Sequence, residues 1–189
     1  MENTERFKMT EKYEDYKATY EEFENLPEDV RAEYWDGVIV FLASPTFEHQ
    51  EIQANLLGEL VPYLKGKECQ ALGELDVKLG TKTLRPDLVI LCDKNKKEKN
   101  RINGAPDLVI EIVSSSSVSR DNFLKLNLYK DSGVKEYWII SPTEQMITVY
   151  EFDNQEIASQ QLYSKEENQK IPLKIFPDFE ILMDDIFTE

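Results

Sequence analysis

Apolar positions follow a helical spacing in one long segment of the chain. After residues 44–46, Ser-Pro-Thr, large apolar side chains recur at every fourth position, at Ile52, Leu56, Leu60 and Leu64. This spacing predicts a helix with one buried face. Pro62 lies late in the pattern and should kink or end the helix. We expect two further helices at residues 10–26 and 119–131, stopped by a proline and a glycine respectively.

Short apolar runs elsewhere predict strands. Residues 33–42 have the pattern of a hairpin, with Asp36-Gly37 as its turn. The run at residues 84–92 is interrupted by Pro86-Asp87. Residues 136–140 and 147–152 form a second expected hairpin, and the end of the chain is expected to hold a strand pair and a short helix. The remaining strands are predicted at residues 71–79 and 107–113.

The order of these elements predicts an α/β fold. The strand at 107–113 is followed by the helix at 119–131 and then by the strand at 136–140, which is the spacing of a βαβ crossover. Strands interleaved with helices favour a mixed central β-sheet flanked by helices on both faces. The chain has no repeat or flexible linker, so we expect a single domain spanning residues 1–189.

The net charge of −15 argues against a nucleic-acid partner until its distribution is considered. Residues 1–36 carry 12 acids and 5 bases, and residues 144–189 carry 11 acids and 3 bases. The segment between them carries 14 of each and is neutral. The acidity therefore belongs to the two ends, and a polyanion is not repelled on average by the middle of the chain.

The sequence indicates a cytoplasmic protein without a membrane segment. No apolar run is long enough to cross a bilayer, and the acidic N-terminal residues lack the apolar core of a secretory signal. Cys69 and Cys92 have neither metal-ligand spacing nor the density of a disulfide framework, so we expect two buried free thiols. The single histidine argues against a serine hydrolase and a zinc cluster of Cys and His, and no serine-hydrolase motif is present. The seven glycines form no phosphate-binding loop.

Two acids interrupt strands that are otherwise apolar, Asp87 in the 84–92 run and Glu111 in the 107–113 run. A buried carboxylate is costly unless it is paired, hydrogen-bonded or bound to a cation. If these strands pair, the two acids repel each other unless a cation lies between them, and Mg²⁺ or Mn²⁺ suits carboxylate oxygens. The alternative is that each acid faces solvent or pairs with a nearby Arg or Lys.

Three further side chains are candidates for the same site. Lys125 follows on the next helix, with Asp121 and Tyr129 on its face, and could steady negative charge on a phosphate; the alternative is a surface pair with Asp121. His49 lies at a helix N-terminus, which favours its neutral form and suits metal ligation or proton transfer. Capping or packing is an equally good reading of His49. Glu33 is either an extra ligand or an exposed acid.

Taken in order, several motifs resemble the Uma2-like family, which has the PD-(D/E)xK restriction-endonuclease fold. Each piece is weak alone, but the ordered set over residues 19–150 is specific. The residues that carry the resemblance are TYEEF at 19–23, EYWDG at 33–37, Ser44-Pro45 with His49, RPD at 85–87, PDLVIEIVS at 106–114, and the spaced signature from Asp121 through Lys125, Tyr129 and Gly133 to Trp138. Residues 151–189 then form an acidic extension.

The resemblance implies that Asp87 and Glu111 are metal ligands. The broader nuclease pattern has a lysine two residues after the second acid, where this chain has Val113. In Uma2-like proteins a lysine of the following helix is thought to replace it, which here would be Lys125. A backbone carbonyl near Ile112 would complete the metal shell.

The expected function is a Mg²⁺-dependent DNA endonuclease, with Mn²⁺ as a possible substitute and His49 or Glu33 as additional ligands. The basic loop at residues 94–101 is the best local candidate for phosphate contacts. A homodimer is expected from the reaction class, because cutting two strands usually needs two sites. The alternative is an inert nuclease-fold protein that acts as an interaction module, which the acidic ends favour.

Overall fold

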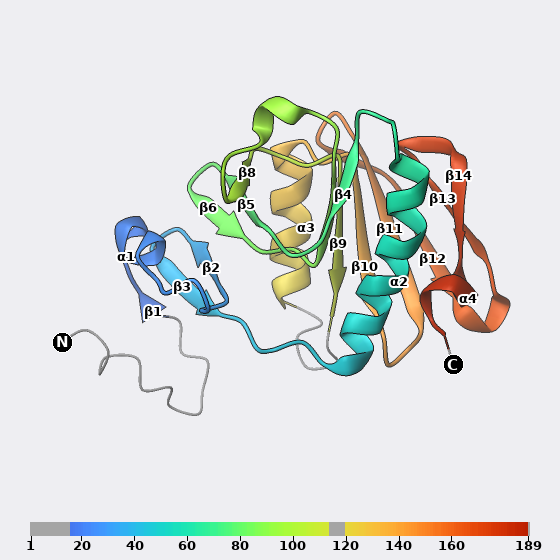
Figure 1. Cartoon of the computed structure of the whole chain (residues 1–189), viewed down its shortest axis with the longest axis horizontal. Helices are drawn as coiled ribbons and strands as arrows, with labels where there is room; N and C mark the ends of the chain where they lie inside the picture. The colour runs from blue at the N-terminus through green and yellow to red at the C-terminus, as the bar shows by residue number, and fades with distance from the viewer. Residues whose placement is uncertain (1–15, 114–119, 189) are drawn as a thin grey trace.

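The computed structural model describes residues 16–113 and 120–188, except for the side chains of residues 120–122. It has two six-stranded sheets and a separate C-terminal hairpin (Figure 1). The main sheet consists, in spatial order, of β12 (Glu156–Ser164), β11 (Met146–Asp153), β10 (Glu136–Ser141), β9 (Leu108–Ile112), β7 (Leu88–Leu91) and β4 (Gln70–Leu72). The second sheet consists of β1 (Tyr16–Lys17), β3 (Val38–Phe41), β2 (Ala32–Trp35), β6 (Lys82–Leu84), β5 (Asp76–Leu79) and β8 (Arg101–Asn103).

Each face of the main sheet is covered by different elements. Helix α2 (Phe47–Leu64) packs on one face of the main sheet through Ile52, Leu56, Leu60 and Leu64, as their four-residue spacing predicted. The hairpin of β13 (Lys170–Leu173) and β14 (Phe176–Leu182), with α4 (Met183–Ile186), extends the same apolar core. The opposite face is covered by helix α3 (Arg120–Ser132) and by side chains of the second sheet. Both faces of the sheet are therefore buried over most of its centre.

Several predicted elements are confirmed. β9, α3 and β10 form the expected βαβ crossover, because β9 and β10 pair in parallel. The β2–β3 hairpin turns at Asp36 and Gly37, which have φ of +46° and +97°, as a two-residue turn of this type requires. Pro62 lies in the last turn of α2, which ends two residues later. The strand pair and short helix expected at the C-terminus are β13, β14 and α4.

The N-terminal helix predicted at residues 10–26 is confirmed only at Tyr20–Glu24 and is wrong at residues 16–19. Residues 10–15 lie outside the described residues, and residues 16–17 form β1, which pairs with β3. The helix α1 is confined to Tyr20–Glu24. It starts there because Thr19 and Glu22 form a capping box, in which each side chain accepts a hydrogen bond from the other's backbone N–H.

Two predicted strands are each divided between the two sheets. Residues 71–79 separate into β4 of the main sheet and β5 of the second, and residues 84–92 separate into β6 and β7. The second crossing occurs at Arg85-Pro86-Asp87, where the proline has no N–H to donate to a ladder. Asp87 therefore stands at the junction of the two sheets rather than inside a strand.

The two cysteines are not free thiols, which corrects the expectation from their spacing. Gln70 pairs with Leu91 in the antiparallel β4–β7 ladder, so that Cys69 and Cys92 are the next residues on either side. They are joined by a disulfide across these two strands. Both are partly buried rather than fully buried. Among the described residues, no helix is long and apolar enough to cross a membrane.

Candidate active site

The two candidate carboxylates lie side by side on neighbouring strands. Leu88 of β7 pairs with Ile110 of β9, which brings Asp87 and Glu111 opposite each other one residue further along. Both are buried, with 8% and 7% of their surfaces exposed. The end of β9 and the starts of α2 and α3 lie at the same end of the molecule (Figure 1). Side chains from both helices can therefore reach the two acids.

The Asp87 carboxylate is held by two groups. The backbone N–H of Ile112 donates to its Oδ2 at 2.6 Å, and Nε2 of His49 lies 3.0 Å from its Oδ1. The backbone carbonyl of Asp87 accepts a hydrogen bond of 2.6 Å from the side-chain amide of Gln53 on α2. Asp87 is thus fixed both to its neighbouring strand and to the helix that packs across it.

Glu111 receives two donors from a single helix. Nζ of Lys125 and the hydroxyl of Tyr129, one helical turn apart on α3, donate to Oε1 at 2.9 Å and 2.7 Å. Burial raises the pKa of the Glu111 carboxyl, and the Asp87 charge adds to this effect, while the Lys125 ammonium opposes it. Because both donors use Oε1, they leave Oε2 to another partner.

Lys125 is shared between two carboxylates. Its ammonium lies 2.9 Å from Oε1 of Glu111 and 2.8 Å from Oε1 of Glu33, which comes from β2 of the second sheet. Burial alone would lower the pKa of Lys125, but the two negative charges outweigh it and raise this pKa well above its usual value. The structure therefore places a charged lysine from α3 beside Glu111, although position 113 is a valine. The side chain of Asp121, its alternative partner, lies outside the described residues.

The pKa of His49 is shifted in the opposite direction from the one that its helix position predicts. Burial would lower its pKa, but the hydrogen bond and the charge of Asp87 outweigh burial and raise it. The expected shift toward the neutral form is therefore opposed in this arrangement, because the Asp87 carboxylate at 3.0 Å stabilises the protonated imidazole. Nδ1 of His49 is buried without a hydrogen-bond partner.

Glu33 is buried rather than exposed, with 3% of its surface accessible. Its Oε2 accepts a hydrogen bond of 3.0 Å from the indole Nε1–H of Trp35. Its Oε1 accepts from the backbone N–H of Arg85 at 3.2 Å as well as from Lys125. Sequence reasoning missed Trp35, although two residues on one strand face the same side and this spacing could have suggested the pair.

The donor chemistry fits a small hard cation held by two carboxylates. Within the described part of the chain, no three side chains of His, Cys, Asp or Glu converge as a metal-binding group. Mg²⁺ needs no such group, since it is commonly bound by one or two carboxylates, with water and substrate oxygens completing its octahedron. Asp87 and Glu111 can provide that pair. The backbone carbonyl expected to join them is that of Ile112, the residue that follows Glu111. Glu33 and His49 do not join them in a three-ligand group.

The basic loop lies too far from the acids to contact the same phosphate. Asp87 precedes β7, whereas the loop begins after its other end, and the four residues of this strand span about 13 Å. In Figure 1, η1 (Lys94–Lys96) lies at the opposite end of the molecule from the start of α2. Arg101 is in any case paired with Glu24 and Glu98.

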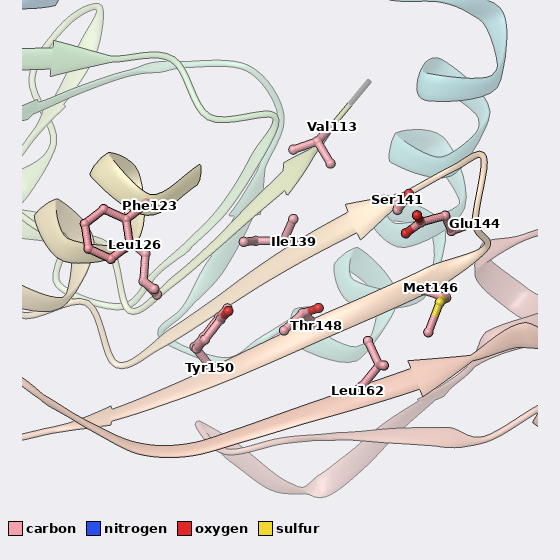
Figure 2. A pocket seen from close by; sticks show the side chains of 10 residues that line it. All are labelled: Val113, Phe123, Leu126, Ile139, Ser141, Glu144, Met146, Thr148, Tyr150 and Leu162. Atoms are coloured by element: carbon pink, nitrogen blue, oxygen red, sulfur yellow. The ribbon is translucent and has the colours of Figure 1, made fainter. Parts of the chain in front are cut away.

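A shallow groove begins close to Glu111. Glu111 pairs with Ile139, and the row continues through Thr148 to Leu162 of β12 at the edge of the main sheet. The groove holds about 300 Å³ and lies between these strands and α3, with Phe123 on its helix side (Figure 2). Phe123 and Leu162 are 64% and 57% exposed. An open, largely apolar path thus leads from the acidic cluster to the sheet edge.

Comparisons with known proteins agree on the relatives of this chain. A crystal structure of a nuclease from Anabaena variabilis, described as "putative" and as belonging to DUF820, superposes with a TM-score of 0.73 at 26% identity, over 90% of this chain and 97% of that one. The protein slr1290 of Synechocystis is 27% identical over 123 residues, and the match spans 62% of this chain and 64% of that relative. The type IIG restriction endonuclease BpuSI matches with a TM-score of only 0.40 at 18% identity, over 64% of this chain and 14% of that one.

The resemblance found in the sequence motifs is confirmed by the family match. The model of the family Uma2, described as "Putative restriction endonuclease", matches residues 20–184, which include most of the acidic extension as well as the expected core. The fold is the mixed α/β fold of restriction-endonuclease-like nucleases, as predicted. The chain belongs to the Uma2 family.

Proposed function

We propose that the protein is a metal-dependent endonuclease that hydrolyses phosphodiester bonds in DNA, with Mg²⁺ or Mn²⁺ held by Asp87 and Glu111. The observation that carries this proposal is the joint placement of two buried carboxylates and the Lys125 ammonium at the meeting point of the two sheets. Two buried acids opposite each other on paired strands are unfavourable without a nearby cation. Lys125 contacts Glu111 and Glu33, whereas Asp87 contacts the His49 imidazole.

Each side chain has a distinct part in the proposed mechanism. A bound divalent cation supplies Lewis-acid chemistry, by lowering the pKa of a water and offsetting phosphate charge. The Ile112 N–H and His49 orient Asp87, and the Tyr129 hydroxyl orients Glu111. Lys125 donates hydrogen bonds to the phosphoryl oxygens as negative charge develops on them. Its ammonium has three N–H groups, so it can keep both carboxylates and still contact a phosphate.

The choice of DNA and the homodimer are part of the same proposal. Family membership supports a nucleic-acid substrate, and the neutral charge of residues 37–143 removes the general repulsion suggested by the total of −15. The groove beside Glu111 would receive sugars and bases beyond the scissile phosphate, with Phe123 available for stacking. A dimer would bring two such sites to the two strands, and sedimentation at micromolar concentration measures this directly.

The test of the proposal is cleavage of supercoiled plasmid with Mg²⁺ and then with Mn²⁺. We expect metal-dependent nicking by the wild-type protein and none by Asp87→Ala or Glu111→Ala. Glu136→Gln is the matched control, because Glu136 is also a fully buried strand glutamate but points into the other core. Nicking that persists in chelator, or in both acid variants, would contradict the metal mechanism.

A second candidate function is an interaction module that keeps the nuclease fold without catalysis. The observation in its favour is the net charge of −15, which is concentrated in the terminal segments and suits a basic partner. Titration with Mn²⁺ distinguishes the two, because an inert fold has no reason to retain affinity at Asp87 and Glu111. Absence of both nicking and Mn²⁺ binding would favour this candidate.

A further inference from the structure

The position of Lys125 depends on groups from outside its own helix. A lysine side chain has four rotatable bonds, and fixing it costs conformational entropy. Here two carboxylates from different parts of the fold hold the ammonium, Glu111 of the main sheet and Glu33 of the second sheet. With Glu111 alone, the ammonium could move around Oε1. The second contact, at 2.8 Å, removes that freedom.

Glu33 is itself firmly placed, and its oxygens are already in use. Trp35 donates to Oε2, while the Arg85 N–H and Lys125 donate to Oε1. A metal ion bridging Glu33 and Glu111 would have to take the place of the ammonium that now lies between them. The arrangement therefore favours a lysine-binding role for Glu33 over a metal-binding one.

Glu33 also links Lys125 to the segment that carries the first metal-ligand candidate. The Arg85 N–H, which donates a hydrogen bond to Glu33, belongs to the segment that crosses between the sheets, two residues before Asp87. One carboxylate thus fixes the lysine relative to both acids, through Glu111 on one side and the crossing segment on the other. A change in Glu33 should disturb this relation without removing either proposed ligand.

We propose that Glu33 is a positioning residue that holds Lys125 in place for phosphodiester hydrolysis and does not bind the metal. This inference rests on the proposed function. It implies that Glu33 acts on the reaction through the position of Lys125 and not as a metal ligand. Glu33 should therefore affect turnover, while the affinity for the metal and for the substrate stays with other residues.

The test compares Glu33→Gln, Lys125→Met and the double variant in plasmid cleavage and in Mn²⁺ titration. We expect Glu33→Gln to lower kcat about 10- to 100-fold, the range for loss of a group that orients a functional residue. KM and the Kd for Mn²⁺ should change less than about threefold. In the Lys125→Met background, Glu33→Gln should cause no further loss, because two residues that act as a unit are not additive.

The control is Glu136→Gln, which changes the other buried glutamate paired with a tryptophan and should leave kcat unchanged. If thermal unfolding curves show that Glu33→Gln is not folded, Glu33→Asp replaces it. This variant keeps the negative charge but withdraws it from Lys125, and the same kcat loss is expected. A tenfold or greater rise in the Mn²⁺ Kd of the Glu33 variant overturns this inference but not the proposed function. An additive loss of kcat in the double variant has the same consequence. A wild-type protein that neither binds Mn²⁺ nor cleaves DNA overturns the proposed function, and the inference falls with it.

Discussion

The tripeptide Glu-Tyr-Trp occurs twice in this chain, at residues 33–35 in β2 and 136–138 in β10. In both copies the indole N–H donates to the glutamate two residues earlier, at 3.0 Å and 2.8 Å. The local structure is the same, because residues i and i+2 of a strand share one face. The surroundings differ: Glu33 meets the Lys125 ammonium, whereas Glu136 is completely buried and meets the backbone N–H of Ile175 at 3.4 Å.

This difference separates an acid with only uncharged partners from one that we propose takes part in the chemistry through Lys125. Burial raises the pKa of Glu136 to about 7, and the donors around it, Trp138 and the Ile175 and Lys174 N–H groups, only partly oppose that shift. None of these donors carries a charge. The cluster around Glu111 instead combines three acids, Asp87, Glu111 and Glu33, with the Lys125 ammonium. Burial of a carboxylate is thus insufficient to mark a site, and the charge of its neighbours decides.

The largest expected effect on cleavage distinguishes the cluster around Glu111 from the surroundings of Glu136. Asp87→Ala and Glu111→Ala should each reduce metal-dependent cleavage at least about 1000-fold, since lowering the pKa of a water from ~15.7 to ~7 depends on the metal. Glu136→Ala should retain cleavage in whatever fraction remains folded. Rates are measured on plasmid and normalised to the folded fraction from circular dichroism. Equal losses in all three variants would remove the distinction.

The next effect isolates the lysine from the metal. Lys125→Met should lower cleavage about 100- to 1000-fold, the range for removing one donor to developing charge. Its Mn²⁺ affinity should be kept or increased, because a competing positive charge leaves Glu111. Isothermal titration measures the affinity. A loss of Mn²⁺ binding in this variant would mean that Lys125 organises the carboxylates rather than acting on the substrate.

Glu136 should give the chain a pH-dependent stability that Glu136→Gln removes. Its pKa of about 7 in the folded protein exceeds the usual 4.5, so the native state binds more protons than the unfolded state between these values. The free energy of unfolding therefore falls as pH rises through this window, by up to about 3 kcal/mol at about 1.4 kcal/mol per pKa unit. Urea unfolding at pH 4.5 and 7.5 tests this. The difference between wild type and variant isolates Glu136, because other carboxyls titrate in both.

The smallest expected effect on kcat comes from replacing the tryptophan in each Glu-Tyr-Trp tripeptide. Trp35→Phe removes one donor from Glu33 and should lower kcat about 3- to 10-fold, corresponding to roughly 1 kcal/mol for a hydrogen bond to a charged group held by other donors as well. Trp138→Phe should leave kcat unchanged and raise the pKa of Glu136 further, since its Nε1–H now opposes that rise. Steady-state cleavage and unfolding curves distinguish the two results. A kcat loss in Trp138→Phe alone would reverse the assignment.

The sequence predicted much of the local structure, and it singled out two acids that the fold brings side by side. The four-residue spacing of Ile52, Leu56, Leu60 and Leu64 predicted α2 correctly. The single charges in two apolar runs predicted that Asp87 and Glu111 share a site, and the two acids do lie opposite each other on neighbouring strands. The division of the 71–79 and 84–92 runs between two sheets was missed, because periodicity describes which face is buried and not which sheet receives the strand. The Cys69–Cys92 disulfide depends on that same long-range pairing of β4 with β7.

The charge states in the site also lie beyond the reach of local sequence. Helix position predicted a shift of the His49 pKa toward the neutral form, but contact with Asp87, 38 residues away in the chain, raises this pKa despite burial. Glu33 was a candidate because of its motif, yet its contact with Lys125 joins residues 92 positions apart. Such contacts arise only when the second sheet packs against α3.

The central claim is that Asp87 and Glu111 hold a divalent cation, and Mn²⁺ titration followed by electron paramagnetic resonance tests it most directly. The account predicts that wild type and Glu136→Gln bind Mn²⁺ with the same Kd, and that Asp87→Asn and Glu111→Gln weaken it at least about tenfold. If wild type binds no Mn²⁺, or if the acid variants bind it as tightly as wild type, the two-carboxylate metal centre is contradicted.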